Sequence, residues 1–85
     1  MVYESHQGTQ CAVSADGLHW TARGFLLRNS GTPLDAHGQV TPFLWSDATG
    51  RQARLFFGVA RDAGWDCNLI CSQSIQPERL ITLLP

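Results

Sequence analysis

Residues 14–24 read SADGLHWTARG, and this stretch decides the fold. Asp16-Gly17 is a strong hairpin signal, because glycine accepts a positive φ and aspartate bonds to its own backbone. The segments on either side, 9–15 and 19–28, have the composition of β-strands. We therefore predict an antiparallel pair joined by a two-residue turn, with a bulge at Gly24 in the second strand.

The rest of the chain alternates between short strand-like segments and clusters of turn-forming residues. The further predicted strands are 2–7, 39–45, 53–60, 67–74 and 79–85, with a single helical turn at 77–80 as the alternative near the end. The most apolar of them, 53–60, is predicted to be a central strand buried on both faces. Turns every 8–12 residues are typical of a sandwich, a barrel or propeller blades. We expect an all-β domain of antiparallel sheets.

Composition limits the classes of partner. The chain has 85 residues, of which 44% are hydrophobic and only 15% charged, so we expect one small domain that forms a homo-oligomer. A net charge of −1 predicts neither a nucleic-acid partner nor an anionic membrane partner. No apolar run approaches the roughly 20 residues of a membrane span. The first residues lack the basic and apolar regions of a signal peptide, so we expect a cytoplasmic protein.

Three cysteines are present, Cys11, Cys67 and Cys71. The last two are four residues apart in a predicted strand, which is about 13 Å and too far for a disulfide. A bridge from Cys11 to either of them is geometrically possible. The second ligand pair of a metal site is missing, so we predict free, mostly buried thiols, no metal and no cofactor.

The stretch VSADGLHWTARG, residues 13–24, resembles the S-x-D-G-x-x-W-T signature of five-bladed β-propeller glycosidases, glycoside hydrolase families 43 and 32. The resemblance implies that Ser14 ends the third strand of a blade and that Trp20 begins the outermost strand. Residues 39–85 look like the following blade, with VTPFLW at 40–45 as its innermost strand. The chain would then hold partial propeller blades: strands of one blade in 1–28, a connecting loop in 29–38 and the next blade in 39–85.

Glycosidases of this type hydrolyse glycosidic bonds with carboxylates from the innermost strands, and the acid commonly precedes a proline. Here Thr41 precedes Pro42, so we expect no catalysis by the isolated chain. The remaining candidates are Asp35 and His37, in the loop that would enter the central face, and Glu4. The structural alternatives are that Asp35 caps a turn, that His37 is solvated, and that Glu4 lies on an exposed strand face.

The candidate carbohydrate-binding residues are Trp65, His37, Asp35 and His6. Trp65 lies in a predicted turn, where an indole can stack on a sugar ring, whereas Trp20 and Trp45 are interpreted as core or seam residues. His6 shares a predicted strand face with Glu4.

Three hypotheses of function follow. The first is a propeller-fragment protein related to glycoside hydrolases, non-catalytic alone, that binds carbohydrate through self-assembly. The second is a glycosidase that is active only as an assembled oligomer. The third is a structural or interaction module unrelated to sugars.

Overall fold

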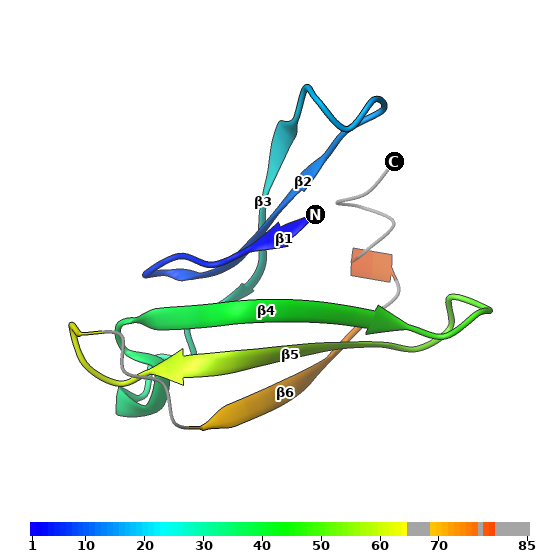
Figure 1. Ribbon diagram of the computed structural model, residues 1–85. Coiled ribbons are helices and arrows are strands. Elements are labelled where there is room, and N and C mark those ends of the chain that lie inside the picture. Colours follow the sequence, from blue (N-terminus) through cyan, green and yellow to red (C-terminus); the bar gives the residue numbers. More distant parts are fainter. Residues whose placement is uncertain (65–68, 77, 80–85) are drawn as a thin grey trace.

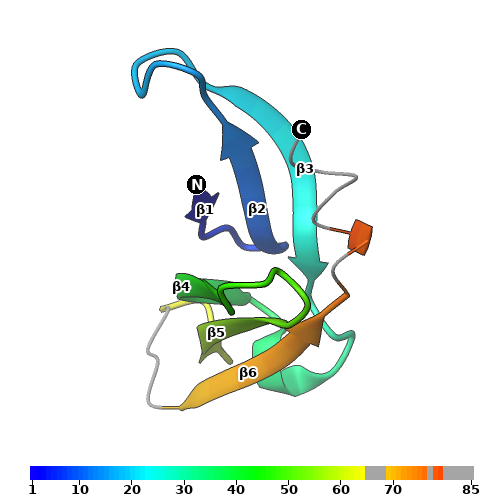
Figure 2. The same cartoon turned by 90° about the vertical axis from the view of Figure 1, so that its right-hand side faces the viewer.

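The computed structural model describes residues 1–64, 69–76, 78 and 79, and its architecture is all-β (Figures 1 and 2). The elements are β1 (Val2–Tyr3), β2 (Gly8–Val13), β3 (Thr21–Arg28), the 3-10 helix η1 (Pro33–Asp35), β4 (Gly38–Ser46), β5 (Ala53–Ala60) and β6 (Ile70–Ile75). They form two antiparallel three-stranded sheets, β1-β2-β3 and β4-β5-β6. The predicted all-β class is confirmed.

The two sheets are not stacked face to face. Figures 1 and 2 show β2 and β3 rising away from the second sheet and running across the direction of its strands. Within the described residues, no helix has the length and apolarity needed to cross a bilayer. The predicted strand at 79–85, and the helical turn that was its alternative, lie outside the described residues except at positions 78 and 79.

The first sheet contains the predicted bulge. Cys11 pairs with Gly24 and Ala12 pairs with Ala22, so Arg23 is the extra residue. Gly24 has a φ of 99°, which explains why glycine suits this point of the strand. The predicted strand 2–7 is wrong beyond Tyr3, because the Ser5 hydroxyl donates to the carbonyl of Gly8 and closes a turn there.

The second sheet has β5 at its centre, as predicted. Alternate residues of β5 pack inward, and they are Ala53, Leu55, Phe57 and Val59. Burial on both faces is confirmed only from Phe57 to Ala60. In the first half of the strand that prediction is wrong, because Arg54 and Phe56 point to the exposed face and Phe56 is 38% exposed.

Strand β4 contains a bulge of its own. Val40 pairs with Gly58 and Phe43 pairs with Phe56, so Thr41 and Pro42 together lie opposite Phe57. Proline has no N–H to donate to a neighbouring strand, which favours an irregular pairing at this point. Thr41 has a φ of 46°, in the left-handed region that β-branched residues rarely adopt.

The two sheets meet at a small apolar core and at a buried polar pair, Gln39 and Thr9. Leu26 of the first sheet joins the buried cluster of β5 and Ile75. Gln39 is fully buried beside it; its side chain accepts a hydrogen bond from the Thr9 hydroxyl at 2.7 Å and donates to the carbonyl of Arg28 at 3.2 Å. A backbone bridge between Ser5 and Gln39 completes the seam.

Candidate functional site

Asp35, predicted both as a weak catalytic candidate and as a sugar-binding residue, lies in a buried position. Asp35 is only 3% exposed, and its carboxylate oxygens accept hydrogen bonds from the amide and the hydroxyl of Ser30. The closest of these contacts is 2.7 Å, from the Ser30 hydroxyl. Asp35 therefore caps the turn before η1, which is the structural alternative stated above.

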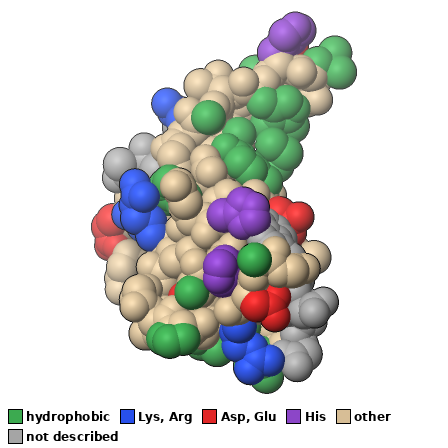
Figure 3. All heavy atoms as spheres, turned by 90° about the vertical axis from the view of Figure 1, so that its left-hand side faces the viewer, with side chains coloured by type: hydrophobic (Ala, Val, Ile, Leu, Met, Phe, Trp, Pro, Cys, Tyr) green, Lys and Arg blue, Asp and Glu red, His purple; other side chains and the backbone are tan. Residues whose placement is uncertain are grey.

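Glu4, His6 and His37 lie on one exposed face, near the seam between the sheets. The Glu4 carboxylate accepts the Thr41 amide N–H at 2.9 Å, and Nδ1 of His6 lies 3.1 Å from the carbonyl of His37, to which it donates when protonated. Figure 3 shows histidine side chains gathered on this face with acidic side chains beside them. Asp35 does not join this group, and Trp65 lies outside the described residues.

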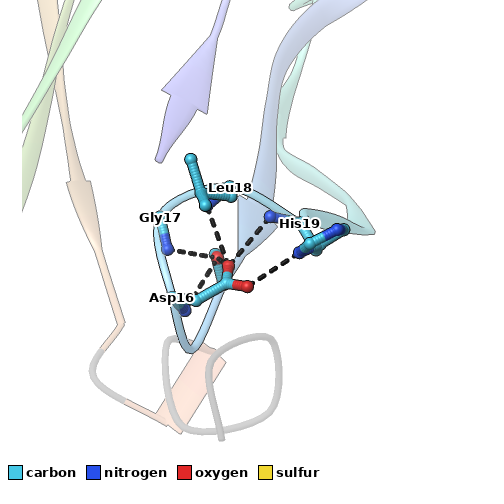
Figure 4. Close-up of polar contacts among 5 residues, drawn as sticks. Asp16, Gly17, Leu18 and His19 are labelled. Carbon is cyan, nitrogen blue, oxygen red and sulfur yellow. Dashed lines mark hydrogen bonds and ion pairs between the residues drawn. The ribbon is translucent and has the colours of Figure 1, made fainter.

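The Asp16-Gly17 stretch does not form the predicted two-residue turn. Strand β2 ends at Val13 and β3 begins at Thr21, so the connection spans 14–20. Figure 4 shows why: the Asp16 carboxylate accepts the amides of Leu18 and His19 at 2.8 and 2.9 Å, while its other oxygen lies 2.7 Å from the His19 ring. These bonds wind the chain around Asp16 and open the hairpin into a wider loop.

The hydrogen bonds around Asp16 also change its acidity. The amide and ring of His19, the amide of Leu18 and the hydroxyl of Ser14 hold the pKa of Asp16 well below its usual range. The Ser14 hydroxyl in turn accepts the amides of Asp16 and Gly17. A hollow of about 390 Å³ adjoins this loop. The Asp16 carboxylate and the Ser14 hydroxyl already bond within the loop, so we interpret this hollow as a consequence of the shape of the loop.

A second hollow, of about 230 Å³, lies in the second sheet, where β4 ends, β5 begins and β6 ends. We call it the Trp45 pocket; it is lined by Trp45, Arg51, Gln52, Ala53, Arg54, Ser74, Ile75 and Gln76. Trp45 is 43% exposed and Trp20 is 47% exposed. The interpretation of these two tryptophans as core residues is therefore wrong, and the alternative that they lie at a seam stays a prediction. Both side chains lie on strand or loop positions that face outward.

The turn that carries Arg51 and Gln52 is fixed by Asp47. One oxygen of Asp47 accepts the Thr49 hydroxyl at 3.1 Å and the amides of Arg51 and Gln52 at 3.0 and 3.4 Å. Desolvation raises the pKa of Asp47, but the hydrogen bonds from Gln52, Thr49 and Arg51 outweigh it, and the pKa stays below the usual value. The backbone of this side of the Trp45 pocket is thus held in place before any ligand arrives.

Arg54 is held on the sheet surface by the neighbouring strand. Its guanidinium donates from Nη1 to the Ser72 hydroxyl at 2.7 Å and from Nη2 to the Ser74 hydroxyl at 3.1 Å. In the strand register, Trp45 pairs with Arg54 and Arg54 pairs with Ser74, so these three residues form one row across β4, β5 and β6. The row places an indole, a guanidinium and a hydroxyl on the same face.

The adjoining row of the same face is aromatic. Phe43 pairs with Phe56, their ring centroids are 6.5 Å apart, and Phe43 is 61% exposed. The sequence carries a signal for this face, since Phe43 and Trp45, like Arg54 and Phe56, are two residues apart and must share a side of their strand. Sequence reasoning missed the Trp45 pocket because this spacing does not show which face of the second sheet is buried against the first sheet.

The residues of the Trp45 pocket suit a ligand with one apolar face and several hydroxyl or anionic groups.

Comparison with family models, with curated proteins and with solved structures finds no match. Among the residues that the structure describes, no three histidine, cysteine or acidic side chains come together as a metal site.

Proposed function

We propose that this chain is a propeller-blade-type β module that binds carbohydrate at the Trp45 pocket without hydrolysing it. The observation that carries the proposal is a half-exposed indole in one row with a fixed guanidinium and a hydroxyl, beside a hollow of about 230 Å³. A sugar ring offers C–H groups that pack on an aromatic face, and hydroxyls that hydrogen-bond to arginine, glutamine and serine. Sites that fix small ligands combine apolar surface with few polar groups in this way.

The order of the strands supports the blade assignment. Each sheet is an antiparallel meander of consecutive strands, and the second follows the first through the loop that contains η1. This is the order that residues 1–28 and 39–85 require if they derive from successive blades. The ancestry is part of the proposal, and the binding of carbohydrate at the Trp45 pocket does not depend on it.

A non-catalytic role agrees with the state of the acidic residues. Glycoside hydrolysis uses two carboxyl groups about 5–10 Å apart that both reach the substrate. Asp35 is buried against Ser30, and Glu4 bonds to the Thr41 backbone. The alternative of a glycosidase active only as an oligomer requires two accessible carboxylates in one assembled site, and Asp35 does not supply one in this conformation.

We propose a second copy of the chain as the protein partner. Phe43, Phe56 and Ile70 lie on the exposed face of the second sheet, with Ile70 73% exposed. The other face of the same sheet packs against Leu26 and its neighbours of the first sheet, so this sheet already buries apolar residues on one side. A net charge of −1 gives little repulsion between copies. Light scattering on a sizing column tests this: a stable monomer, unchanged by Phe43→Ser, contradicts it.

The carbohydrate proposal is tested with a matched pair of tryptophan variants. Trp45→Ala should weaken saccharide binding at least tenfold, whereas Trp20→Ala, which removes an indole of similar exposure from the loop between β2 and β3, should leave it unchanged. Calorimetric titration of the full chain with a panel of neutral and acidic oligosaccharides gives both affinities. Equal loss in the two variants, or no binding of any saccharide by the unmodified chain, contradicts the proposal.

A further inference from the structure

We infer that the Trp45 pocket selects an acidic saccharide, a sugar residue that carries a carboxylate, and that Arg51 and Arg54 bind that carboxylate. The inference rests on the proposed carbohydrate function and names its ligand class. It follows from the charge of the pocket, from the donors that remain on its arginines and from its size.

The pocket is basic although the chain as a whole is slightly acidic. Two of its eight lining residues are arginines, and none is an aspartate or a glutamate. Asp47, in the adjacent turn, accepts backbone amides with one carboxylate oxygen. In the described part of the chain, no carboxylate forms an ion pair with either guanidinium. Two guanidinium groups that pair with no described carboxylate, beside a hollow, attract an anion, since low-dielectric walls strengthen the field.

The guanidinium of Arg54 is held in a way that suits a planar anion. A guanidinium carries five N–H donors, and Arg54 uses one from each of Nη1 and Nη2 on Ser72 and Ser74. Donors therefore remain, and the two serines restrict the rotation of the group. A guanidinium held in this way binds a carboxylate with little loss of side-chain entropy. The backbone amide of Arg51 donates to the Asp47 carboxylate, which fixes the backbone there, and Arg51 lines the same hollow.

The remaining lining residues indicate a sugar rather than a bare anion. Trp45 provides an aromatic face, and Gln52 and Gln76 provide amides that both donate to and accept from hydroxyls. The volume of about 230 Å³ is below the 300–1,000 Å³ of typical drug-sized sites, so we assign the pocket a single sugar residue. A sugar residue of the uronic-acid type uses the cations, the indole and the amides together.

The experiment compares three probes on the full chain by calorimetric titration. The probes are an oligogalacturonate, the same oligosaccharide with its carboxylates methyl-esterified, and inorganic phosphate. We expect the oligogalacturonate to bind at least tenfold more tightly than its ester and to weaken several-fold between 50 and 500 mM salt. Phosphate, which lacks a face for the indole, should bind at least tenfold more weakly than the oligogalacturonate.

Variants identify the residues. Arg51→Gln and Arg54→Gln should each reduce oligogalacturonate binding about tenfold and leave the ester unaffected. Arg23→Gln, an exposed arginine of the first sheet, is the matched control and should change neither. Because Arg54→Gln also removes its bonds to Ser72 and Ser74, its thermal midpoint is measured alongside, and Arg51→Gln alone suffices if that variant unfolds.

The outcomes separate this inference from the proposed function. Equal binding of acid and ester, still lost in Trp45→Ala, overturns the acidic ligand and keeps the carbohydrate site. Binding of phosphate as tight as that of the oligogalacturonate reduces the pocket to an anion site and overturns both. Binding of the oligogalacturonate that Arg51→Gln and Arg54→Gln do not weaken places it elsewhere and also overturns the inference.

Discussion

The carboxylate of Glu4 holds the backbone of Thr41 through a hydrogen bond of 2.9 Å to its amide. Thr41 has a φ of 46°, which costs a β-branched residue about 1–3 kcal/mol. The first sheet's turn therefore stabilises a strained bulge at the start of the second sheet's edge strand. In the resemblance to propeller glycosidases, the same position before Pro42 is where an acid would lie.

Relief of that strain should raise stability. Asparagine tolerates the left-handed region, so Thr41→Asn should stabilise the fold by about 1 kcal/mol. Thr41→Val keeps the β-branch and should give no gain in stability. Glu4→Ala removes the acceptor and should destabilise by about 1 kcal/mol. Urea unfolding followed by tryptophan fluorescence measures all three. A loss of stability in Thr41→Asn would show that the hydroxyl matters more than the backbone strain.

The loop around Asp16 should respond to acid. The pKa of Asp16 is lowered in the folded chain, first by the amide and ring of His19, so the ionised form is favoured by folding. Its contribution to stability is complete above the ordinary aspartate pKa of about 3.9 and is lost as the pH falls below that value. The thermal midpoint, followed from pH 7 to pH 2, reports this loss, whereas the NMR shifts of the Leu18 and His19 amides should stay nearly constant through the ordinary aspartate range.

Asp16→Asn provides the comparison for that titration. The amide side chain stays neutral throughout, so the variant should have a lower thermal midpoint at pH 7 and a shallower fall of that midpoint in acid. His19→Ala removes one contact and should raise the pKa of Asp16 part of the way towards its usual value. An acid slope in Asp16→Asn as steep as in the unmodified chain would show that other carboxylates cause it.

Gln39 should be one of the costliest side chains to replace. Gln39→Leu leaves the buried Thr9 hydroxyl and the Arg28 carbonyl without their partner, at about 3 kcal/mol in total. Adding Thr9→Val removes one of the unpaired groups, so the double variant should recover about 1 kcal/mol relative to Gln39→Leu. Chemical denaturation of the three chains measures this coupling, and strictly additive losses would contradict it.

Gly38 should tolerate alanine poorly because of close packing at the seam. A Cβ at this position would clash with the carbonyl oxygen of Ser5 and approach the Cα of His6. Gly31 also has a positive φ, 84°, but a Cβ there meets open space. Gly31→Ala should therefore cost about 1 kcal/mol, and Gly38→Ala about 1–3 kcal/mol more. Equal losses in the two variants would mean that the seam relaxes to accept a methyl group.

Local signals predicted the strands well and their connections less well. The segment 53–60, predicted as a central strand because it is the most apolar run, matches β5 in its bounds and position, although its first half is covered on one face only. The Asp16-Gly17 turn was predicted too short, because the same carboxylate that favours a tight turn can bond to the amides of Leu18 and His19 instead. Whether the tight turn or the wider loop forms depends on the other residues of the loop, and the Asp-Gly dipeptide alone carries no information about them.

The candidate site was harder to predict than the fold. The candidates Asp35, His37, Glu4 and His6 follow from an expected position at the central face of a propeller, whereas the Trp45 pocket is formed by strand register. Arg54 and Ser74 are 20 positions apart in the chain and become neighbours only because β5 and β6 pair as they do. Side-chain chemistry is visible in a sequence, but the alignment of one strand against the next is set by the packed core.

The division of the chain into two meanders joined at Gln39 has a consequence for the order of folding. Each sheet pairs strands that are consecutive in the chain, so its contacts form by closing short loops. The bonds of Gln39 to Thr9 and Arg28, and those of the Arg79 guanidinium to the carbonyls of Phe25 and Leu26, join the two halves. We expect hairpins to appear early and docking to be the slow step, so Gln39→Leu should accelerate unfolding more than it slows folding.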